Sequence, residues 1–73
     1  MPKLPVDISG QEAVKAFRRA GWTIARFGVH IIMEKENTPV TLSIPNHKIL
    51  ARGTLRSLLR DAELSVEEFV DLL

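Results

Sequence analysis

Two short stretches in the middle of the chain alternate between apolar and polar residues, and this alternation constrains the fold more than any other feature. They are VHIIMEK (29–35) and VTLSI (40–44), separated by ENTP, in which Asn37 and Pro39 are typical turn residues. Successive side chains of a strand point to opposite faces of a sheet. The pair therefore predicts an antiparallel hairpin with one covered face and one open face.

Helices are predicted on both sides of these strands in the sequence. A serine followed three residues later by glutamate forms a capping box, which marks the start of a helix. The pattern occurs at Ser9–Glu12 and again at Ser65–Glu68, where it opens a short last helix. Gly21 is a natural end for the first helix. Between these two helices, Thr54 is expected to cap another helix, in which leucines recur at helical spacing.

With a further strand at WTIARF (22–27) and a turn at Gly28, the predicted order is α-β-β-β-α followed by a short helix. The predicted fold class is α+β, with a three-stranded antiparallel sheet and the helices packed on one face. Alternation predicts that the side chains facing the helices are Val29, Ile31, Met33, Val40, Leu42 and Ile44. The side chains predicted for the open face are His30, Ile32, Glu34, Thr41 and Ser43.

Length and composition favour one small domain over residues 1–73. The chain has no cysteine, which excludes a disulfide framework and a thiolate nucleophile. Its apolar runs are far too short for a membrane span. The start, MPKLPVDISG, lacks the apolar core of a signal peptide. We therefore expect a cytoplasmic protein that does not bind membranes.

The net charge of +1 is unevenly distributed along the chain. Residues 1–60 hold all ten Lys and Arg and four of the nine Asp and Glu, which gives a balance of +6. Residues 61–73 hold the other five carboxylates and no Lys or Arg, which gives −5. The basic body indicates a polyanionic partner, whereas the acidic end is also what a solvated helix rich in glutamate would show.

His30 and His47 are the candidates for proton transfer, because only histidine has an ordinary side-chain pKa between pH 5 and 8. Each is equally compatible with a solvated surface position. Two histidines without cysteine, and without carboxylates at ligand spacing, do not favour a zinc site. Neither a nucleophile elbow nor a phosphate loop of the GxxxxGK type is present. The sequence therefore predicts no metal and no other cofactor.

The segment KILARGTLRSLLR (48–60) offers a basic surface suited to phosphate. Lys48 and Arg52 precede a predicted helix start, where free N–H groups and the positive end of the helix dipole attract anions. Arg56 and Arg60 follow one helical turn apart, away from the leucines. A solvated helix face is an equal alternative. Base stacking is not indicated, because three aromatic residues lie in core patterns, namely Phe17, Trp22 and Phe69.

Four segments resemble, in order, the HicA family of toxins, the mRNA interferases of bacterial type II toxin–antitoxin pairs. They are SGQEAVKAFRRAGW, ARFGVHIIMEK, SIPNH and GTLRSLLRDAELSVEEF, and they cover nearly all of residues 4–73. The GTLRSLLRDA block and the Pro-x-His before it are the more specific pieces. The resemblance implies a fold like that of a double-stranded-RNA-binding domain, which agrees with the element order predicted above.

The resemblance also implies a catalytic residue. The family's catalytic histidine lies in a Gly-Ser-His motif at the start of the second strand, which corresponds to Gly28, Val29 and His30. His30 would then serve a metal-independent endoribonuclease, and His47 in the Pro-x-His element would have a supporting role. The chain departs from the family at Val29, which replaces the serine, and the stretch from Arg26 to His30 is one residue shorter.

Together with the basic segment, the resemblance implies a set of RNA-binding residues around His30. They are Arg26, Gly28, His47, Lys48, Arg52, Thr54 and Arg56. The implied partners are mRNA and a HicB-type antitoxin that covers the active surface, without contact of the toxin alone to DNA. Two alternatives stay open. One is a catalytically weak or inactive RNA-binding module of the same fold, and the other is an interaction domain whose partner binds the open sheet face.

Overall fold

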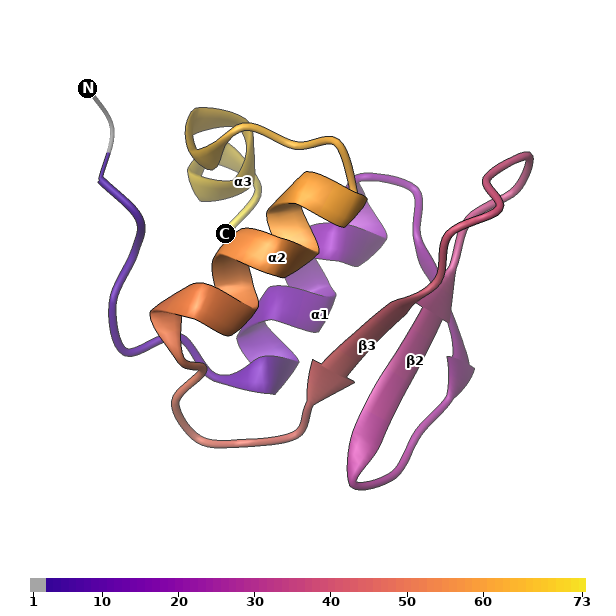
Figure 1. The fold of residues 1–73 in the computed structure, drawn as a ribbon, viewed down its shortest axis with the longest axis horizontal. Coiled ribbons are helices and arrows are strands. Elements are labelled where there is room, and N and C mark those ends of the chain that lie inside the picture. The colour runs from indigo at the N-terminus through magenta and orange to yellow at the C-terminus, as the bar shows by residue number, and fades with distance from the viewer. Residues whose placement is uncertain (1–2) are drawn as a thin grey trace.

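The computed structural model describes residues 3–73 and has the predicted α+β architecture. Its elements are α1 (Gly10–Arg19), β1 (Thr23–Arg26), β2 (His30–Glu34), β3 (Leu42–Pro45), α2 (Arg52–Asp61) and α3 (Val66–Leu72). The strands form an antiparallel sheet in the order β1-β2-β3. The three helices lie on one side of this sheet (Figure 1). The fold is therefore consistent with that of a double-stranded-RNA-binding domain, as predicted.

Local sequence signals define α1 at both ends. Ser9 Oγ accepts a hydrogen bond from Glu12 N at 3.0 Å, and Ser9 N donates to Glu12 Oε1 at 3.1 Å. This confirms the predicted capping box. At the other end, Gly21 has a φ of +102°, which a residue with a side chain rarely adopts. Trp22 N donates to Phe17 O across this turn, which completes the helix C-terminus.

The prediction that Thr54 caps α2 is wrong. The helix begins two residues earlier, at Arg52, and its N-cap is Ala51, which supplies no side-chain hydrogen bond. Leu50 explains the earlier start, because its side chain is buried in the core and its backbone N donates to Ile8 O at 2.7 Å. The chain therefore becomes helical soon after Leu50. Thr54 lies inside the first turn of α2 and is half-buried.

The hairpin has the predicted register and mostly the predicted faces. Its inner face is buried and is formed by Ile31, Met33, Leu42 and Ile44. His30, Glu34 and Ser43 are exposed on the open face, with Ile32 half-buried between them. Two residues predicted to face the helices do not. Val29 is 79% exposed and Val40 is 40% exposed, because β2 begins only at His30 and β3 only at Leu42. The connection between these strands is therefore longer than predicted, with Asn37 at a positive φ of 61° as its turn residue.

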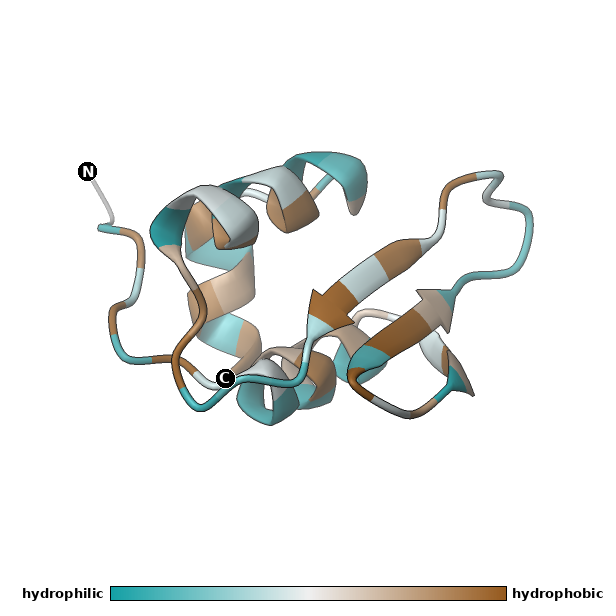
Figure 2. Cartoon of the chain, turned by 60° about the horizontal axis from the view of Figure 1, so that its bottom comes forward, coloured by the Kyte–Doolittle hydropathy of each residue, from teal (hydrophilic) through white to brown (hydrophobic). Residues whose placement is uncertain are grey.

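The helices hold the core against the inner face of the sheet. Phe17 of α1 and Phe69 of α3 are fully buried, and their ring centroids lie 5.4 Å apart at an interplanar angle of 44°. Arg19 Nη1 donates to Leu72 O at 2.6 Å, which joins the ends of the same two helices. Ser65 and Glu68 form the predicted second capping box at the start of α3. Figure 2 shows hydrophobic segments on the helices and on the strands of the sheet. No helix within residues 3–73 is long and apolar enough to cross a bilayer.

Candidate functional site

The two histidines lie near one end of the sheet, on segments that adjoin in space. His30 is the first residue of β2 and pairs with Pro45, the last residue of β3. The turn that enters β2 and the loop that leaves β3 are therefore neighbours, both at the lower edge of Figure 1. His47 follows Pro45 by two residues in this loop and is also exposed.

Asn46 fastens the turn before His30 to the rest of the molecule. Its backbone N donates to Val29 O at 3.0 Å, and its side-chain Nδ2 donates to Gly28 O at 3.4 Å. Its Oδ1 accepts from Gln11 Nε2 on α1 at 3.3 Å. One half-buried side chain thus connects the β1–β2 turn with the beginning of α1. The backbone around His30 is held by residues distant in the sequence.

A β-bulge turns Arg26 toward the same face as His30. Ile24 pairs with Met33, so continued regular pairing would place Arg26 opposite Ile31, on the covered face of the sheet. The register shifts by one residue between Ile24 and Arg26, and Arg26 pairs instead with Ile32. Such bulges redirect side chains. Arg26 thereby joins the open face, in the row next to His30.

Around His30 the surface forms a shallow hollow of about 380 Å³. Its lining residues come from the end of β1, the turn and β2, and they are Arg26, Phe27, Gly28, Val29, His30 and Ile32. No carboxylate is among them. The hollow therefore combines one guanidinium, one imidazole and several apolar groups on an open surface.

A second hollow of about 300 Å³ lies where the β3–α2 loop meets the start of α1. It is lined by Ser9, Gln11, Asn46, His47 and Lys48. Gly10 permits this meeting, because a Cβ at that position would overlap Pro45 O. Its backbone N donates to His47 O at 2.9 Å. The backbone position of His47 is thus set by α1, while its side chain stays exposed.

The remaining predicted RNA-binding residues lie on α2 and line neither hollow. Arg52 and Arg56 are exposed, and Thr54 is half-buried between them in the sequence. Arg60 is exposed as well. The predicted residues therefore form two adjacent groups at the end of the sheet, one around each hollow. The predicted residues on α2 form a separate basic stretch.

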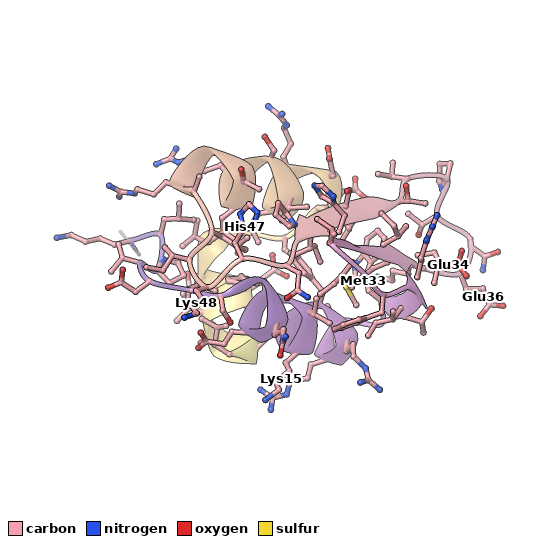
Figure 3. The ribbon with its side chains drawn as sticks, turned by 90° about the horizontal axis from the view of Figure 1, so that it is seen from below. Lys15, Met33, Glu34, Glu36, His47 and Lys48 are labelled. Carbon is pink, nitrogen blue, oxygen red and sulfur yellow. The ribbon has the colours of Figure 1, made fainter. Side chains whose placement is uncertain are left out.

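The acidic residues of the strand hairpin and of α3 lie away from His47 and from the β1–β2 turn. In Figure 3, Glu34 and Glu36 are at one end of the molecule, on the strand hairpin, whereas His47 and Lys48 lie on the loop well away from them. The acidic helix α3 is on the side opposite the β1–β2 turn (Figure 1). Within residues 3–73, no three His, Cys, Asp or Glu side chains gather closely enough to hold a metal ion. The linings of the two hollows include Arg26 and Lys48 and no carboxylate.

A comparison with protein families identifies the chain. The model of a family described as "HicA toxin of bacterial toxin-antitoxin" matches residues 10–64, three quarters of the sequence. The chain belongs to the HicA toxin family. It is accordingly a toxin of a toxin–antitoxin system and has an antitoxin as its partner. No curated protein matches it. The matched residues of this HicA-family chain include all of α2, the whole lining of the first hollow, and the lining of the second hollow except Ser9.

Sequence reasoning missed three residues of this HicA-family site. Asn46 stands between Pro45 and His47, but only its distant acceptors and donor reveal its bridging role. Gln11 lies in the first predicted helix, where no local pattern indicates its hydrogen bond to Asn46. Phe27 ends the predicted first strand, yet it is 61% exposed beside His30. Its place next to Gly28, in a turn, was the signal that could have pointed to exposure.

Proposed function

We propose that this HicA-family toxin is an endoribonuclease that cleaves mRNA in the cytoplasm, with His30 as its general base. The observation that carries the proposal is the exposed His30 at the start of β2, beside Arg26 in one hollow. Histidine is suited to proton transfer near neutral pH. A cation in the adjacent row is suited to a phosphate group that gains charge during the reaction.

In the proposed reaction, neutral His30 takes the proton from a ribose 2′-OH. The 2′-oxygen forms a bond to the adjacent phosphorus, and the bond from phosphorus to the 5′-oxygen of the next nucleotide breaks. The leaving 5′-oxygen takes up a proton from water and His30 returns its proton to water, so the products are a 2′,3′-cyclic phosphate and a 5′-hydroxyl. The reaction uses protein groups alone and requires the 2′-OH, which DNA lacks.

The proposed RNA path continues from the first hollow to the second and on to α2. Gly28 leaves backbone accessible in the turn, His47 and Lys48 line the second hollow, and Arg52 with Arg56 are exposed on the helix. Thr54 contributes less to RNA binding in this arrangement, since it is half-buried and does not cap the helix. Phosphate contacts of this kind release counterions, so binding weakens as salt rises.

The proposed antitoxin partner is of HicB type and covers the open sheet face with the loop from Pro45 to Arg52. This surface combines exposed cations with apolar side chains, and an acidic partner would complement it. Hydrogen exchange with and without the antitoxin tests the location. Protection is expected in the β1–β2 turn and the loop, and protection confined to α3 would contradict it.

One observation favours a second candidate, an RNA-binding module with little or no catalysis. Where the HicA family has a serine, Val29 presents an exposed apolar side chain next to His30, without a hydroxyl for phosphate. Binding to RNA would then persist without cleavage. Mapping of RNA ends after incubation with the purified protein separates the two candidates.

The decisive experiment is His30→Ala, compared with His47→Ala as the matched control. Loss of a general base lowers a rate by about 10²- to 10⁴-fold, so His30→Ala should abolish growth inhibition and RNA cleavage. His30 is exposed, so the variant should keep the circular dichroism spectrum and RNA affinity of the parent. His47→Ala should retain more activity.

Cleavage is measured with a purified single-stranded RNA, with and without EDTA, and growth is measured after induction without antitoxin. Unchanged cleavage in the presence of EDTA is expected for a reaction that needs no metal. A folded His30→Ala variant that degrades RNA like the parent would overturn the assignment. A parent that binds RNA without cutting it would favour the second candidate.

A further inference from the structure

We propose that the exposed ring of Phe27 stacks on a base of the RNA substrate, namely the base of the nucleotide whose 2′-OH reacts. This inference rests on the proposed endoribonuclease function and adds a contact that selects the form of the substrate. Phe27 lines the same hollow as His30 and Arg26. The hollow thereby offers an aromatic face together with groups for the ribose and the phosphate.

Phe27 differs from every other aromatic residue of the chain. The side chains of Phe17, Trp22 and Phe69 are at most 2% exposed and belong to the core, whereas Phe27 is 61% exposed. Turn positions are usually occupied by small or polar residues, yet both neighbours of Gly28 are apolar and exposed, Phe27 on one side and Val29 on the other. Figure 2 accordingly shows hydrophobic colouring within the turn that enters β2. Burial in the core therefore does not explain why an aromatic residue occupies position 27.

The position of the ring next to His30 determines the proposed occupant. A ribose that presents its 2′-OH to His30 carries its base on the adjacent carbon, so that base must lie within or beside the hollow. Aromatic side chains bind unpaired bases by stacking, and each such contact is sequence-tolerant because every base has a π-face. The apolar floor at Ile32 and Val29 suits a flat, largely apolar ligand.

The charges near the hollow agree with a nucleotide. Arg26 is the cation in its lining, and no carboxylate lines it. The acidic residue on the same strand and face, Glu34, is at the other end of β2, about 13 Å along the strand at its usual rise per residue. A phosphate attached to the stacked nucleotide therefore meets a cation without a nearby carboxylate.

The contact has a consequence for substrate selection. A base inside a duplex is already stacked on its neighbours and paired, so its face is not free for Phe27. The toxin should therefore cut single-stranded RNA in preference to the same sequence in a duplex. This preference differs from the shape recognition of duplex RNA with which folds of this type are associated.

The experiment is a double-mutant cycle between Phe27 and the base. After the main cut in a short single-stranded RNA has been mapped, a second RNA is made with an abasic ribonucleotide at the reacting position, which keeps the 2′-OH. Removal of a stacking side chain costs about 1–3 kcal/mol per base, so Phe27→Ala should lower kcat/KM for the intact RNA roughly 5- to 160-fold. It should have little effect on the abasic RNA. Phe27→Trp keeps an aromatic ring at this position, so it should cleave the intact RNA about as well as the parent does.

Binding is measured separately, so that failure of the proposed chemistry does not obscure the result. A 2-aminopurine is placed at each position of a single-stranded RNA in turn, with the 2′-OH of that nucleotide methylated. At one position or more its fluorescence should fall when the parent binds and should not fall with Phe27→Leu. Val70→Ala is the matched control, because Val70 on α3 is 41% exposed and lines neither hollow. It should behave like the parent in both assays.

Three results would overturn the proposal. The first is an equal effect of Phe27→Ala on intact and abasic RNA. The second is an unchanged 2-aminopurine signal for the parent at every position. The third is weaker antitoxin binding by Phe27→Ala with no change toward RNA, which would make Phe27 a protein contact. Fluorescence loss that depends on Phe27 supports the stacking contact even where the parent does not cleave, and in that case only the proposed catalysis fails.

Discussion

The helical layer and the turn end of this HicA-family toxin use apolar residues in opposite ways. In the helical layer, formed by α1, α2 and α3, most apolar side chains are buried, and the ring centroids of Phe17 and Phe69 lie 5.4 Å apart. At the turn end, formed by residues 26–30 and 45–48, Phe27 and Val29 face solvent beside His30. The turn end is held mostly by backbone hydrogen bonds and by Asn46. Stability and the proposed activity therefore reside in different parts of the chain, and single substitutions can separate them.

The largest expected effect is a difference in stability between two Phe→Ala substitutions, one in each region. Phe69→Ala removes a fully buried ring, and such changes cost about 3–5 kcal/mol. A chain of this length has a total stability of roughly 4–11 kcal/mol. Phe69→Ala should therefore leave little folded protein, whereas Phe27→Ala at the exposed site should change the free energy of unfolding by less than about 0.5 kcal/mol.

Urea denaturation followed by circular dichroism measures both variants. The contrast would be broken if Phe27→Ala destabilised the protein as much as Phe69→Ala. Such a result would mean that the β1–β2 turn belongs to the cooperative core. A well-folded Phe69→Ala protein would mean that α3 contributes less than its contacts with α1 indicate.

A smaller effect is expected where the two regions touch. A Cβ at Gly10 would overlap Pro45 O, so Gly10→Ala must push the β3–α2 loop away from α1. Overpacking of this kind costs about 1–3 kcal/mol. Because Pro45 pairs with His30, the shift should lower both stability and RNA cleavage. Gly53→Ala is the matched control, since nothing lies within 4 Å of its new Cβ and alanine favours a helix by about 0.5–1 kcal/mol.

Thermal denaturation and cleavage assays on the two glycine variants test this coupling. Gly53→Ala should raise the melting temperature slightly, and Gly10→Ala should lower it. If Gly10→Ala lost stability but cleaved RNA at the parent's rate per folded molecule, the loop position would not matter to the site. Stability and cleavage would then be independent of each other even where the two regions are in contact.

The smallest expected effect lies within the helical layer, at the start of α3. Ser65 Oγ accepts from Glu68 N at 3.0 Å, and loss of an N-cap side chain costs about 1 kcal/mol. Ser65→Ala should therefore lower stability modestly and leave RNA cleavage per folded molecule unchanged. Reduced cleavage at full folding would show that α3 influences the turn end.

The same cap gives a pH dependence. The Ser65 backbone N–H donates to the Glu68 carboxylate, and this bond, followed by the Ser65 side-chain bond, lowers the pKa of Glu68 below its ordinary value of 4.5. A carboxyl group with a lower pKa in the folded state stabilises that state above pH 4.5, and the contribution is lost as the pH falls through the folded pKa. Glu68→Gln should be less stable than the parent at pH 7, and the difference should shrink below pH 4.5. A constant difference across this range would contradict the assignment.

Much of the fold could be predicted because its signals are local. The capping boxes at Ser9 and Ser65 and the turn at Gly21 each involve residues within a few positions of one another. The alternation around Ile31 and Ile44 requires only the period of two in a strand. Thr54 was misassigned because Leu50, anchored to Ile8, determines where α2 begins. That contact spans more than forty residues and leaves no local pattern.

The candidate site was predictable in its residue types and less so in its arrangement. The exposed positions of His30, Lys48 and Arg56 follow from strand alternation or from loop and helix-face patterns. Their catalytic and RNA-binding roles stay predictions. Val29 does not face the helices as predicted, because β2 begins only at His30. Val29 lies in the preceding turn, where the alternation of strand side chains does not apply.

Local residue patterns are enough to predict the element order, the two capped helices, the covered face of the hairpin and the exposure of His30. These depend on the intrinsic geometry of helices and strands, which a few neighbouring residues specify. Only the packed fold shows that a bulge turns Arg26 onto the open face, that Asn46 joins Gly28 to Gln11, and that Phe27 stays outside the core. Each of these depends on contacts between segments far apart in the chain. Such contacts form only when the whole core is packed, because the free energy that fixes them comes from burial elsewhere in the molecule.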